Sequence, residues 1–161
     1  MYTYKRTIKS GDMIEVEYYQ SIRKIGKNYG GRKSNNSLSS AKMRKANKLR
    51  AVKHMQRLIN ANFGSGDFFC RFSAPYGTYE TEEEFRKEVN KWLDRINYRR
   101  KKQGKGRLKY IAFIECGKSG KNWHIHIIVS KGDRELLFEQ WPYENGQNFT
   151  PLYKNENFKK L

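Results

Sequence analysis

Apolar and polar residues follow two different periods along this sequence, and these periods predict its elements. In Ile14–Tyr18 they alternate every second residue, which predicts a half-buried strand. From roughly residue 39 to residue 62, apolar residues recur at the spacing of an amphipathic helix, which Ser39 or Ser40 can cap. The apolar stripe of this helix is Leu49, Val52, Met55, Ile59 and Phe63.

The same helix and the segment before it are strongly basic. Residues 23–37 have no period and are rich in Gly, Asn, Ser, Lys and Arg, which predicts a loop that either follows a phosphate backbone or is a solvated linker. The charges on the helix are nearly all of one sign, which fits a solvated face or nucleic-acid contact. They are Lys42, Arg44, Lys45, Lys48, Arg50, Lys53 and Arg57.

A strand and a helix with clear ends are predicted next. Gly64–Gly66 ends the first helix, and Asp67–Ser73 then alternates as a strand. Its faces are Phe68, Cys70 and Phe72 on one side, and Phe69, Arg71 and Ser73 on the other. The capping box Thr81–Glu84 begins the next helix, and Gly104 fits its C-terminus. The buried stripe predicted for it is Phe85, Val89, Trp92, Leu93 and Ile96.

The last part of the chain predicts shorter elements. Asp133 can cap a short helix that runs through Trp141, and Phe149–Tyr153 is extended. Asn155 or Asn157 can cap a further helix, but barely one turn of it is present, so we expect the sequence to stop within an element.

The segment Lys109–Val129 predicts a hairpin whose turn is Gly117–Asn122. If Cys116 faces Trp123, then Glu115 lies opposite His124 and Phe113 lies opposite His126. Cross-strand neighbours have Cβ atoms about 5 Å apart, so Glu115, His124 and His126 share one face and are close enough to hold one ion. A slip of one residue would bury Glu115 in the apolar face, which is costly for an unpaired carboxylate.

Two imidazoles and one carboxylate with open positions accept Mg²⁺, Mn²⁺, Fe²⁺ or Zn²⁺. Such an ion can polarise a phosphodiester and stabilise the charge that develops on it. Redox chemistry at a two-histidine, one-carboxylate site is an alternative. In a third interpretation, the two histidines form hydrogen bonds in a pocket and hold no metal.

The net charge of the protein favours nucleic acid as its partner. The 161 residues include 34 Lys and Arg against 16 Asp and Glu, a net charge of +18. A polyanion explains this excess, and the absence of a long apolar run or signal peptide disfavours a membrane partner and predicts a soluble, cytoplasmic protein. Lys118 and Lys121 in the hairpin turn, and less strongly Arg71, are candidate DNA contacts. Cys70 and Cys116 are interpreted as two buried, reduced thiols.

The hairpin and its surroundings also resemble a known family. Trp123–Val129 resembles the HUH motif, two histidines flanking a hydrophobic residue, of rolling-circle replication initiators from phages and plasmids. The resemblance extends over about residues 46–161. It includes Leu58–Asp67 with the strand after it, the capped helix, Tyr110–Glu115, Gln140–Gly146 and Phe149–Tyr153. It therefore divides the chain into a strand with a basic flexible segment, residues 1–45, and an HUH-type nuclease domain, residues 46–161.

The resemblance implies an α+β fold, an antiparallel sheet flanked by helices with the His-x-His on a central strand. It implies a divalent metal, Mg²⁺ or Mn²⁺, held by Glu115, His124 and His126, and no small-molecule cofactor. The implied activity is a DNA endonuclease and nucleotidyltransferase that nicks a single-stranded or hairpin origin and starts rolling-circle replication. Relaxases and transposases use the same chemistry, and a non-catalytic module that binds single-stranded DNA or RNA is the alternative from a different class.

The family's nucleophile is a tyrosine on a helix after the metal strand, in a Tyr-x-x-Lys pattern, and it forms a 5′-phosphotyrosine. No such pattern follows His126: Tyr143 precedes Gly146 by three residues, and Tyr153 precedes Glu156 by three. The resemblance therefore implies a nucleophile beyond Leu161 in a truncated chain. Tyr153 is the secondary candidate, and its other interpretation is a packing role.

Overall fold

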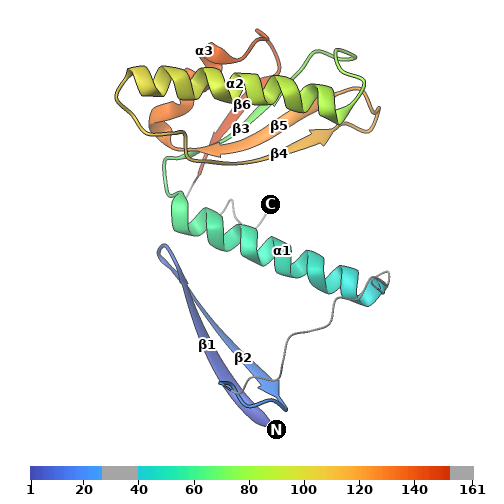
Figure 1. The fold of residues 1–161 in the computed structure, drawn as a ribbon, viewed down its shortest axis with the longest axis vertical. Helices are drawn as coiled ribbons and strands as arrows, with labels where there is room; N and C mark the ends of the chain where they lie inside the picture. The colour runs from blue at the N-terminus through green and yellow to red at the C-terminus, as the bar shows by residue number, and fades with distance from the viewer. Residues whose placement is uncertain (27–39, 153–161) are drawn as a thin grey trace. The chain divides into compact units, whose positions relative to one another are not determined.

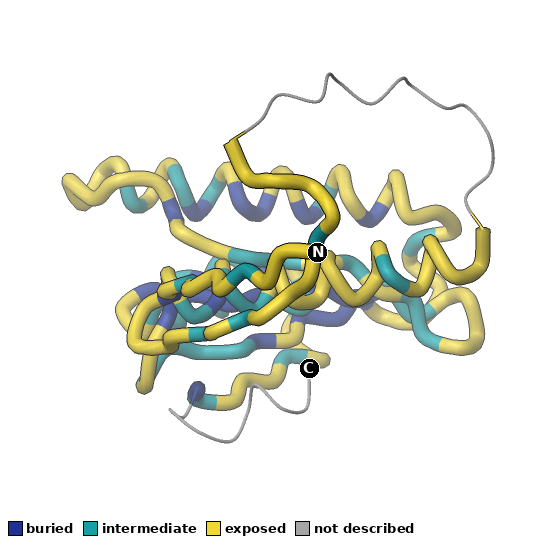
Figure 2. The backbone as a smooth tube through the Cα atoms, turned by 90° about the horizontal axis from the view of Figure 1, so that it is seen from below, coloured by how far each residue is buried: buried dark blue, intermediate teal, exposed yellow. Residues whose placement is uncertain are grey.

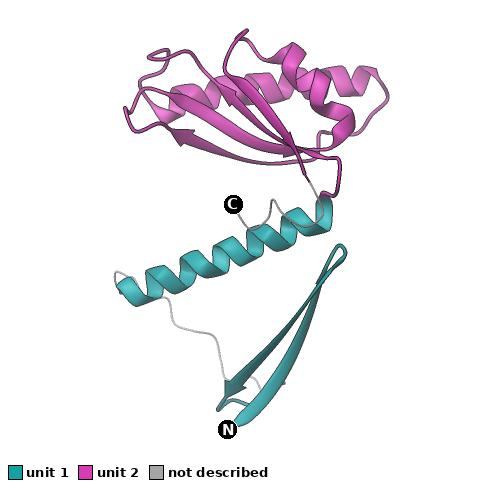
Figure 3. Cartoon of the chain, turned by 180° about the vertical axis from the view of Figure 1, so that it is seen from behind, with its two compact units in different colours: residues 1–62 teal, residues 63–161 magenta. Residues whose placement is uncertain are grey.

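The computed structural model describes residues 1–26 and 40–152, and these form two compact units, Met1–Asn62 and Phe63–Leu161 (Figures 1 and 3). The described part of the chain is α+β, with two antiparallel sheets and three α-helices, as expected from the sequence. The structural division lies after Asn62, whereas the sequence-based division lies after residue 45. Most of the loop predicted over residues 23–37 lies outside the described residues. None of the helices described is long and apolar enough to cross a membrane.

The first unit contains β1 (Tyr2–Ser10), β2 (Met13–Ser21) and α1 (Ala41–Asn62). The two strands form an antiparallel hairpin, of which the apolar pattern predicted only the middle of β2. In the turn, Gly11 has a φ of 59°, and a Cβ atom there would lie 2.1 Å from the Asn60 carbonyl oxygen of α1. Only glycine fits this close approach of hairpin and helix. The Ser40 hydroxyl accepts a hydrogen bond from the Met43 N–H at 3.3 Å and so caps α1.

Ion pairs hold the hairpin against α1. The Arg57 guanidinium lies 2.7 Å from the Glu15 carboxylate and 2.9 Å from the Glu17 carboxylate, and the Lys53 ammonium lies 3.1 Å from Glu17. The hydrogen bond from Arg57 lowers the pKa of Glu15, and that from Lys53 lowers the pKa of Glu17. These contacts explain why the structural division keeps α1 with the hairpin.

The apolar stripe of α1 is exposed over most of its length. Leu49, Val52 and Met55 are exposed, and of the predicted stripe only Ile59 and Phe63 are buried. The period shows which side chains share a side of a helix, but it does not show whether another element covers that side. Here the hairpin approaches α1 through charged side chains instead.

Acidification is expected to loosen the hairpin from α1. Because the folded-state pKa values of Glu15 and Glu17 lie below the ordinary value of 4.5, the stabilisation is present above that value and is lost as the pH falls through the lowered values. Hydrogen-exchange protection of the β1 and β2 amides should therefore decrease between neutral pH and about pH 3. Arg57→Gln should lower this protection already at neutral pH and weaken its response to acid. Equal protection at both pH values would contradict the prediction.

The second unit contains a four-stranded antiparallel sheet of order β4-β5-β3-β6 (Figure 1). Its strands are β3 (Phe68–Ser73), β4 (Tyr110–Cys116), β5 (Trp123–Val129) and β6 (Gln147–Pro151). The helices are α2 (Glu82–Lys102) and α3 (Arg134–Gln140), with the short 3-10 turn η1 (Lys131–Asp133) before α3. The His-x-His lies on β5, an interior strand, and the predicted register of β4 and β5 is confirmed throughout.

Helices α2 and α3 cover one face of this sheet and form the core with it (Figures 1 and 2). Trp92 of α2 is fully buried, contacts Phe72 and Trp141, and donates from its indole N–H to the Leu137 carbonyl of α3 at 3.1 Å. The stripe predicted for α2 is confirmed at all five positions. Both cysteines are free, but only Cys70 is buried, whereas Cys116 at the end of β4 is half-buried, contrary to expectation. Burial raises the pKa of the Cys70 thiol to about 12.

The predicted helix ends were right for α2 and only partly right for α3. Thr81 and Glu84 form the capping box, and Gly104 follows the C-cap of α2 with a φ of 70°. Asp133 precedes α3 but makes no capping hydrogen bond. Its buried carboxylate instead binds the Arg100 guanidinium at the end of α2. An unpaired buried charge costs more free energy than a helix N-terminus without a side-chain cap.

Candidate metal centre

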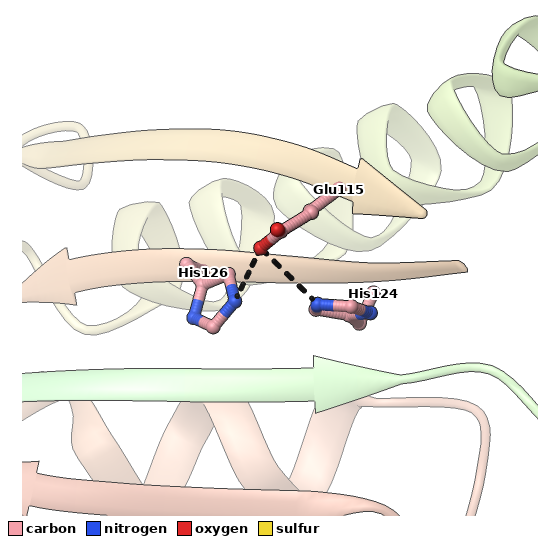
Figure 4. Close-up of side chains that lie close together, drawn as sticks. All are labelled: Glu115, His124 and His126. Atoms are coloured by element: carbon pink, nitrogen blue, oxygen red, sulfur yellow. Dashed lines mark ion pairs between the residues drawn. The ribbon is translucent and has the colours of Figure 1, made fainter. Parts of the chain in front are cut away.

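Three potential ligands meet on the sheet face that α2 and α3 leave uncovered. The pairing of β4 with β5 sets Glu115 opposite His124 and Phe113 opposite His126. The Nε2 atoms of His124 and His126 lie 3.4 and 3.3 Å from the same Glu115 carboxylate oxygen, Oε2 (Figure 4). One ligand atom from each residue lies within 4.8 Å of the others, so this group could hold a metal ion.

The three side chains differ in exposure. The side chains of His124 and His126 are 9% and 16% exposed, whereas that of Glu115 is 59% exposed. The imidazoles therefore form the inner wall of the site, and the carboxylate stands at its solvent side. This arrangement leaves the site accessible to a large substrate.

A backbone hydrogen bond orients His124. Its Nδ1 lies 3.2 Å from the Asn122 carbonyl oxygen at the end of the hairpin turn. Because a carbonyl oxygen only accepts, Nδ1 is the protonated nitrogen of a neutral His124 ring, and the lone pair is then on Nε2, the atom that lies beside Glu115. A hydrogen bond from the second ring nitrogen to a carbonyl is the usual support of a metal-binding histidine.

His126 is held by aromatic packing. Its ring stacks on Phe113 at 4.9 Å between centroids and on Phe69 at 5.3 Å, with interplanar angles of 22° and 10°. Its Nδ1 is buried and has no hydrogen-bond partner in the described part of the chain. Burial first, and then His124, lowers the pKa of His126. The ring is therefore neutral at pH 7, which is the form that binds metals.

The candidate DNA contacts lie around this face and its end. Arg71 of β3 pairs in register with His126, is exposed, and forms no ion pair among residues 1–26 and 40–152. Lys118 and Lys121 are exposed in the turn from Gly117 to Asn122, as expected. The Gly77 N–H donates to the Lys121 carbonyl at 3.0 Å, so the loop after β3 adjoins this turn and brings the exposed Tyr76 near it.

Two tyrosines follow His126 in the sequence, Tyr143 and Tyr153. Tyr153 lies outside the described residues. The Tyr143 hydroxyl lies 2.5 Å from the Tyr79 hydroxyl, and burial together with this hydrogen bond raises the pKa of Tyr79. This pair joins the loop before α2 to the loop after α3, which is a structural role.

The sequence missed the supports of the two histidines. The hairpin register places Phe113 opposite His126, but it does not show that the two rings stack. The second ring, Phe69, comes from β3, about 55 residues earlier in the chain. No local pattern indicates that β3 lies beside β5, because that pairing is long-range.

Comparison with known proteins adds a family to this geometry. Residues 77–158, about half of the chain, match the family model of the replication-associated protein ORF2. The matched residues include Glu115, His124 and His126, whereas β1, β2, α1 and β3 lie before them. Neither the comparison with curated proteins nor that with solved structures gave a match.

Proposed function

Because the chain belongs to the replication-associated protein ORF2 family, we propose that it nicks one strand of DNA, with a divalent metal, to initiate rolling-circle replication. The observation that carries the proposal is the convergence of two histidine Nε2 atoms on one Glu115 carboxylate oxygen at an accessible sheet face. The proposed enzyme is an HUH-type endonuclease and nucleotidyltransferase that is specific for site and strand.

The donor set fits a divalent ion. His124 and His126 offer ring nitrogen atoms, and Glu115 adds a carboxylate with two oxygen atoms. We propose Mg²⁺ or Mn²⁺, because the exposed carboxylate and the solvent beside it supply the oxygen ligands that these ions prefer. When bound, the ion would polarise the scissile phosphodiester and offset the charge that develops on it.

Aromatic support of His126 should be measurable as metal affinity. Phe113→Ala removes one of the two rings that hold the imidazole, so we expect Mn²⁺ affinity to fall about tenfold, as for other residues that orient a ligand. Phe113→Tyr keeps the ring and should bind as the wild type. Phe149→Ala is the matched control, because Phe149 is 41% exposed and Phe113 is 44% exposed. Titration calorimetry measures all three, and unchanged affinity in Phe113→Ala would exclude the role.

The proposed substrate is single-stranded DNA or the single-stranded part of a hairpin origin. Arg71 brings positive charge to the sheet face that carries Glu115, His124 and His126. Lys118 and Lys121 bring positive charge to the turn at the end of this face. The Lys118→Gln/Lys121→Gln variant should lower the log–log slope of affinity against salt by about 1.4, since each contact with a single-stranded phosphate contributes about 0.7. Fluorescence anisotropy at several salt concentrations gives the slope, and a wild-type slope would place the DNA elsewhere.

The proposed nucleophile is a tyrosine outside the described residues. Its oxygen would form a bond to phosphorus as the bond from phosphorus to the 3′ oxygen breaks, leaving a 5′-phosphotyrosine and a free 3′-hydroxyl. This is the chemistry implied by the resemblance. Mass spectrometry of a trapped adduct identifies the residue, and Tyr153→Phe tests the candidate within this sequence.

The function is tested with fluorescently labelled single-stranded DNA carrying a candidate origin, incubated with the protein and Mn²⁺. A covalent adduct or a cleaved strand that EDTA abolishes supports the proposal. Binding that EDTA does not affect, with no product on any candidate origin, favours the second function, a non-catalytic nucleic-acid-binding module. The net charge of +18 favours that alternative as well, because it requires only phosphate contacts.

A further inference from the structure

The positive charge of this protein is distributed unevenly between its two units. Residues 1–62 contain 15 Lys and Arg against three Asp and Glu, whereas residues 63–161 contain 19 against 13. Two thirds of the net charge of +18 therefore belongs to the smaller unit. None of its residues falls within the segment that matches the replication-associated family. The charge of the first unit is thus not explained by the metal centre on the second.

Within the first unit, the charge is concentrated on α1. This helix has seven Lys and Arg over 22 residues and no Asp or Glu. Helix α2 is almost equally long and has eight Lys and Arg, but five acidic residues accompany them. Its acids begin the helix and pair along it, as in Glu82–Arg86 and Glu88–Lys91. The first turn of α1 instead contains basic residues, which oppose the helix dipole.

The hairpin neutralises only one side of α1. Glu15 and Glu17 pair with Lys53 and Arg57. Each helical residue advances by about 100°, so Lys53 lies about 140° and Arg57 about 180° around the helix from Lys48. Lys48 is therefore directed away from the side that the hairpin pairs with.

Three basic residues share this second side. Arg44 and Lys45 precede Lys48 by four and three residues, and residues at these spacings are neighbours on a helix. All three are exposed, and none forms an ion pair within the part of the chain that the structure describes. Like charges at these spacings destabilise a helix, and a bound anion would remove the repulsion. We name Arg44, Lys45 and Lys48 the α1 basic surface.

The composition of α1 indicates which polyanion fits. Proteins that bind single strands combine basic residues with aromatic side chains on which the bases stack. Helix α1 contains no Phe, Tyr or Trp. Duplex DNA keeps its bases stacked and presents closely spaced phosphates, and an exposed helix fits its major groove. Every residue from Ala41 to Met55 except Ala46 is exposed, so this part of α1 has the form such a contact requires.

We propose that the α1 basic surface binds the phosphates of duplex DNA, as a second nucleic-acid site separate from the metal centre. This goes beyond the proposed nicking of single-stranded DNA, since it requires neither the metal nor Glu115, His124 and His126. In a replication-associated protein, such a site would hold the duplex that flanks an exposed origin strand.

The test uses the full chain in EDTA and measures its affinity for a duplex of about 20 base pairs, and for one of its single strands, at several salt concentrations. Arg44→Gln/Lys45→Gln/Lys48→Gln should lower duplex affinity about tenfold or more and reduce the salt slope by about 3. The matched control is Arg86→Gln/Lys87→Gln/Lys91→Gln on α2, which removes the same residue types and should bind the duplex as the wild type does. Circular dichroism checks that both variants keep their helices.

The outcomes distinguish this proposal from the proposed function. Wild-type duplex affinity and slope in the α1 variant would overturn it, and so would an equal loss of duplex and single-strand binding. An equal loss in the α2 control would also overturn it, because net charge alone would then explain binding. If no DNA is nicked with Mn²⁺ but duplex binding depends on the α1 basic surface, the proposed function fails and this site remains. His124→Ala should bind the duplex unchanged.

Discussion

Replacing His124 with alanine is expected to lower Mn²⁺-dependent DNA nicking by more than about 100-fold, the upper effect of residues that only support a metal ligand. The reason is geometric. His124 contributes one of the two ring nitrogen atoms, and its Nδ1 faces the Asn122 carbonyl, so Nε2 is the atom available to the ion. No other described histidine, cysteine or carboxylate joins this group.

The chain contains its own control for this variant. His54, the third histidine, is exposed on α1, and His54→Ala should nick at the wild-type rate. Glu115→Gln keeps the shape of the side chain but removes its charge, so it should weaken Mn²⁺ binding while the thermal unfolding temperature changes little. Gel analysis of the cleaved strand and calorimetric titration of Mn²⁺ measure the two effects. Full nicking by His124→Ala would show that the proposed centre is not where the reaction occurs.

The largest effect on stability is expected from Trp92→Ala, at about 3–5 kcal/mol of the free energy of unfolding. Trp92 is fully buried and contacts Phe72 of the sheet and Trp141 after α3. Its indole N–H also donates a hydrogen bond to the Leu137 carbonyl. This carbonyl is one of the last four of α3, and the last four carbonyls of a helix have no hydrogen-bond donor within the helix. The substitution therefore removes packing and leaves a buried acceptor unpaired.

Trp92→Phe separates the two contributions. It keeps an aromatic ring but loses the hydrogen bond, so it should be destabilised less than Trp92→Ala. The unpaired Leu137 carbonyl should lower the free energy of unfolding by about 1–3 kcal/mol relative to the wild type. Tyr98→Ala on the same helix is the control, because Tyr98 is 58% exposed. This variant should have a free energy of unfolding close to that of the wild type. Urea unfolding monitored by circular dichroism gives the three values. A similar loss in the exposed and buried variants would contradict the assigned core.

The geometry of the candidate metal centre was predictable because it depends on one local hairpin. Strict alternation along β4 and β5 assigns each side chain to a face, and the cost of burying Glu115 selects one register. The resulting pairs, Glu115 with His124 and Phe113 with His126, are those in the structure. The ends of α2 were predictable for the same reason, since a capping box involves residues only three apart.

Most of the differences between expectation and structure concern contacts between distant parts of the chain. Asp133 is of a residue type that often caps helices, but Arg100, 33 residues earlier, binds its carboxylate. Leu49, Val52 and Met55 have the spacing of an apolar stripe but are exposed. The hairpin instead contacts the helix through ion pairs between its glutamates and Lys53 and Arg57. Strand β1 was missed because its polar residues conceal the alternation and only its partner shows a pattern.

The sequence by itself determined most of the elements, the register of the β4–β5 hairpin and the set of three potential ligands, because side-chain periodicity and local capping act over a few residues. Only the tertiary structure decided that β3 lies beside β5, so that Phe69 stacks on His126 and Arg71 reaches the metal face. It also decided which side of α1 is neutralised and which remains basic. Such pairings form between segments far apart in the chain, where many partners satisfy the same local pattern and only the packing of the whole unit selects one.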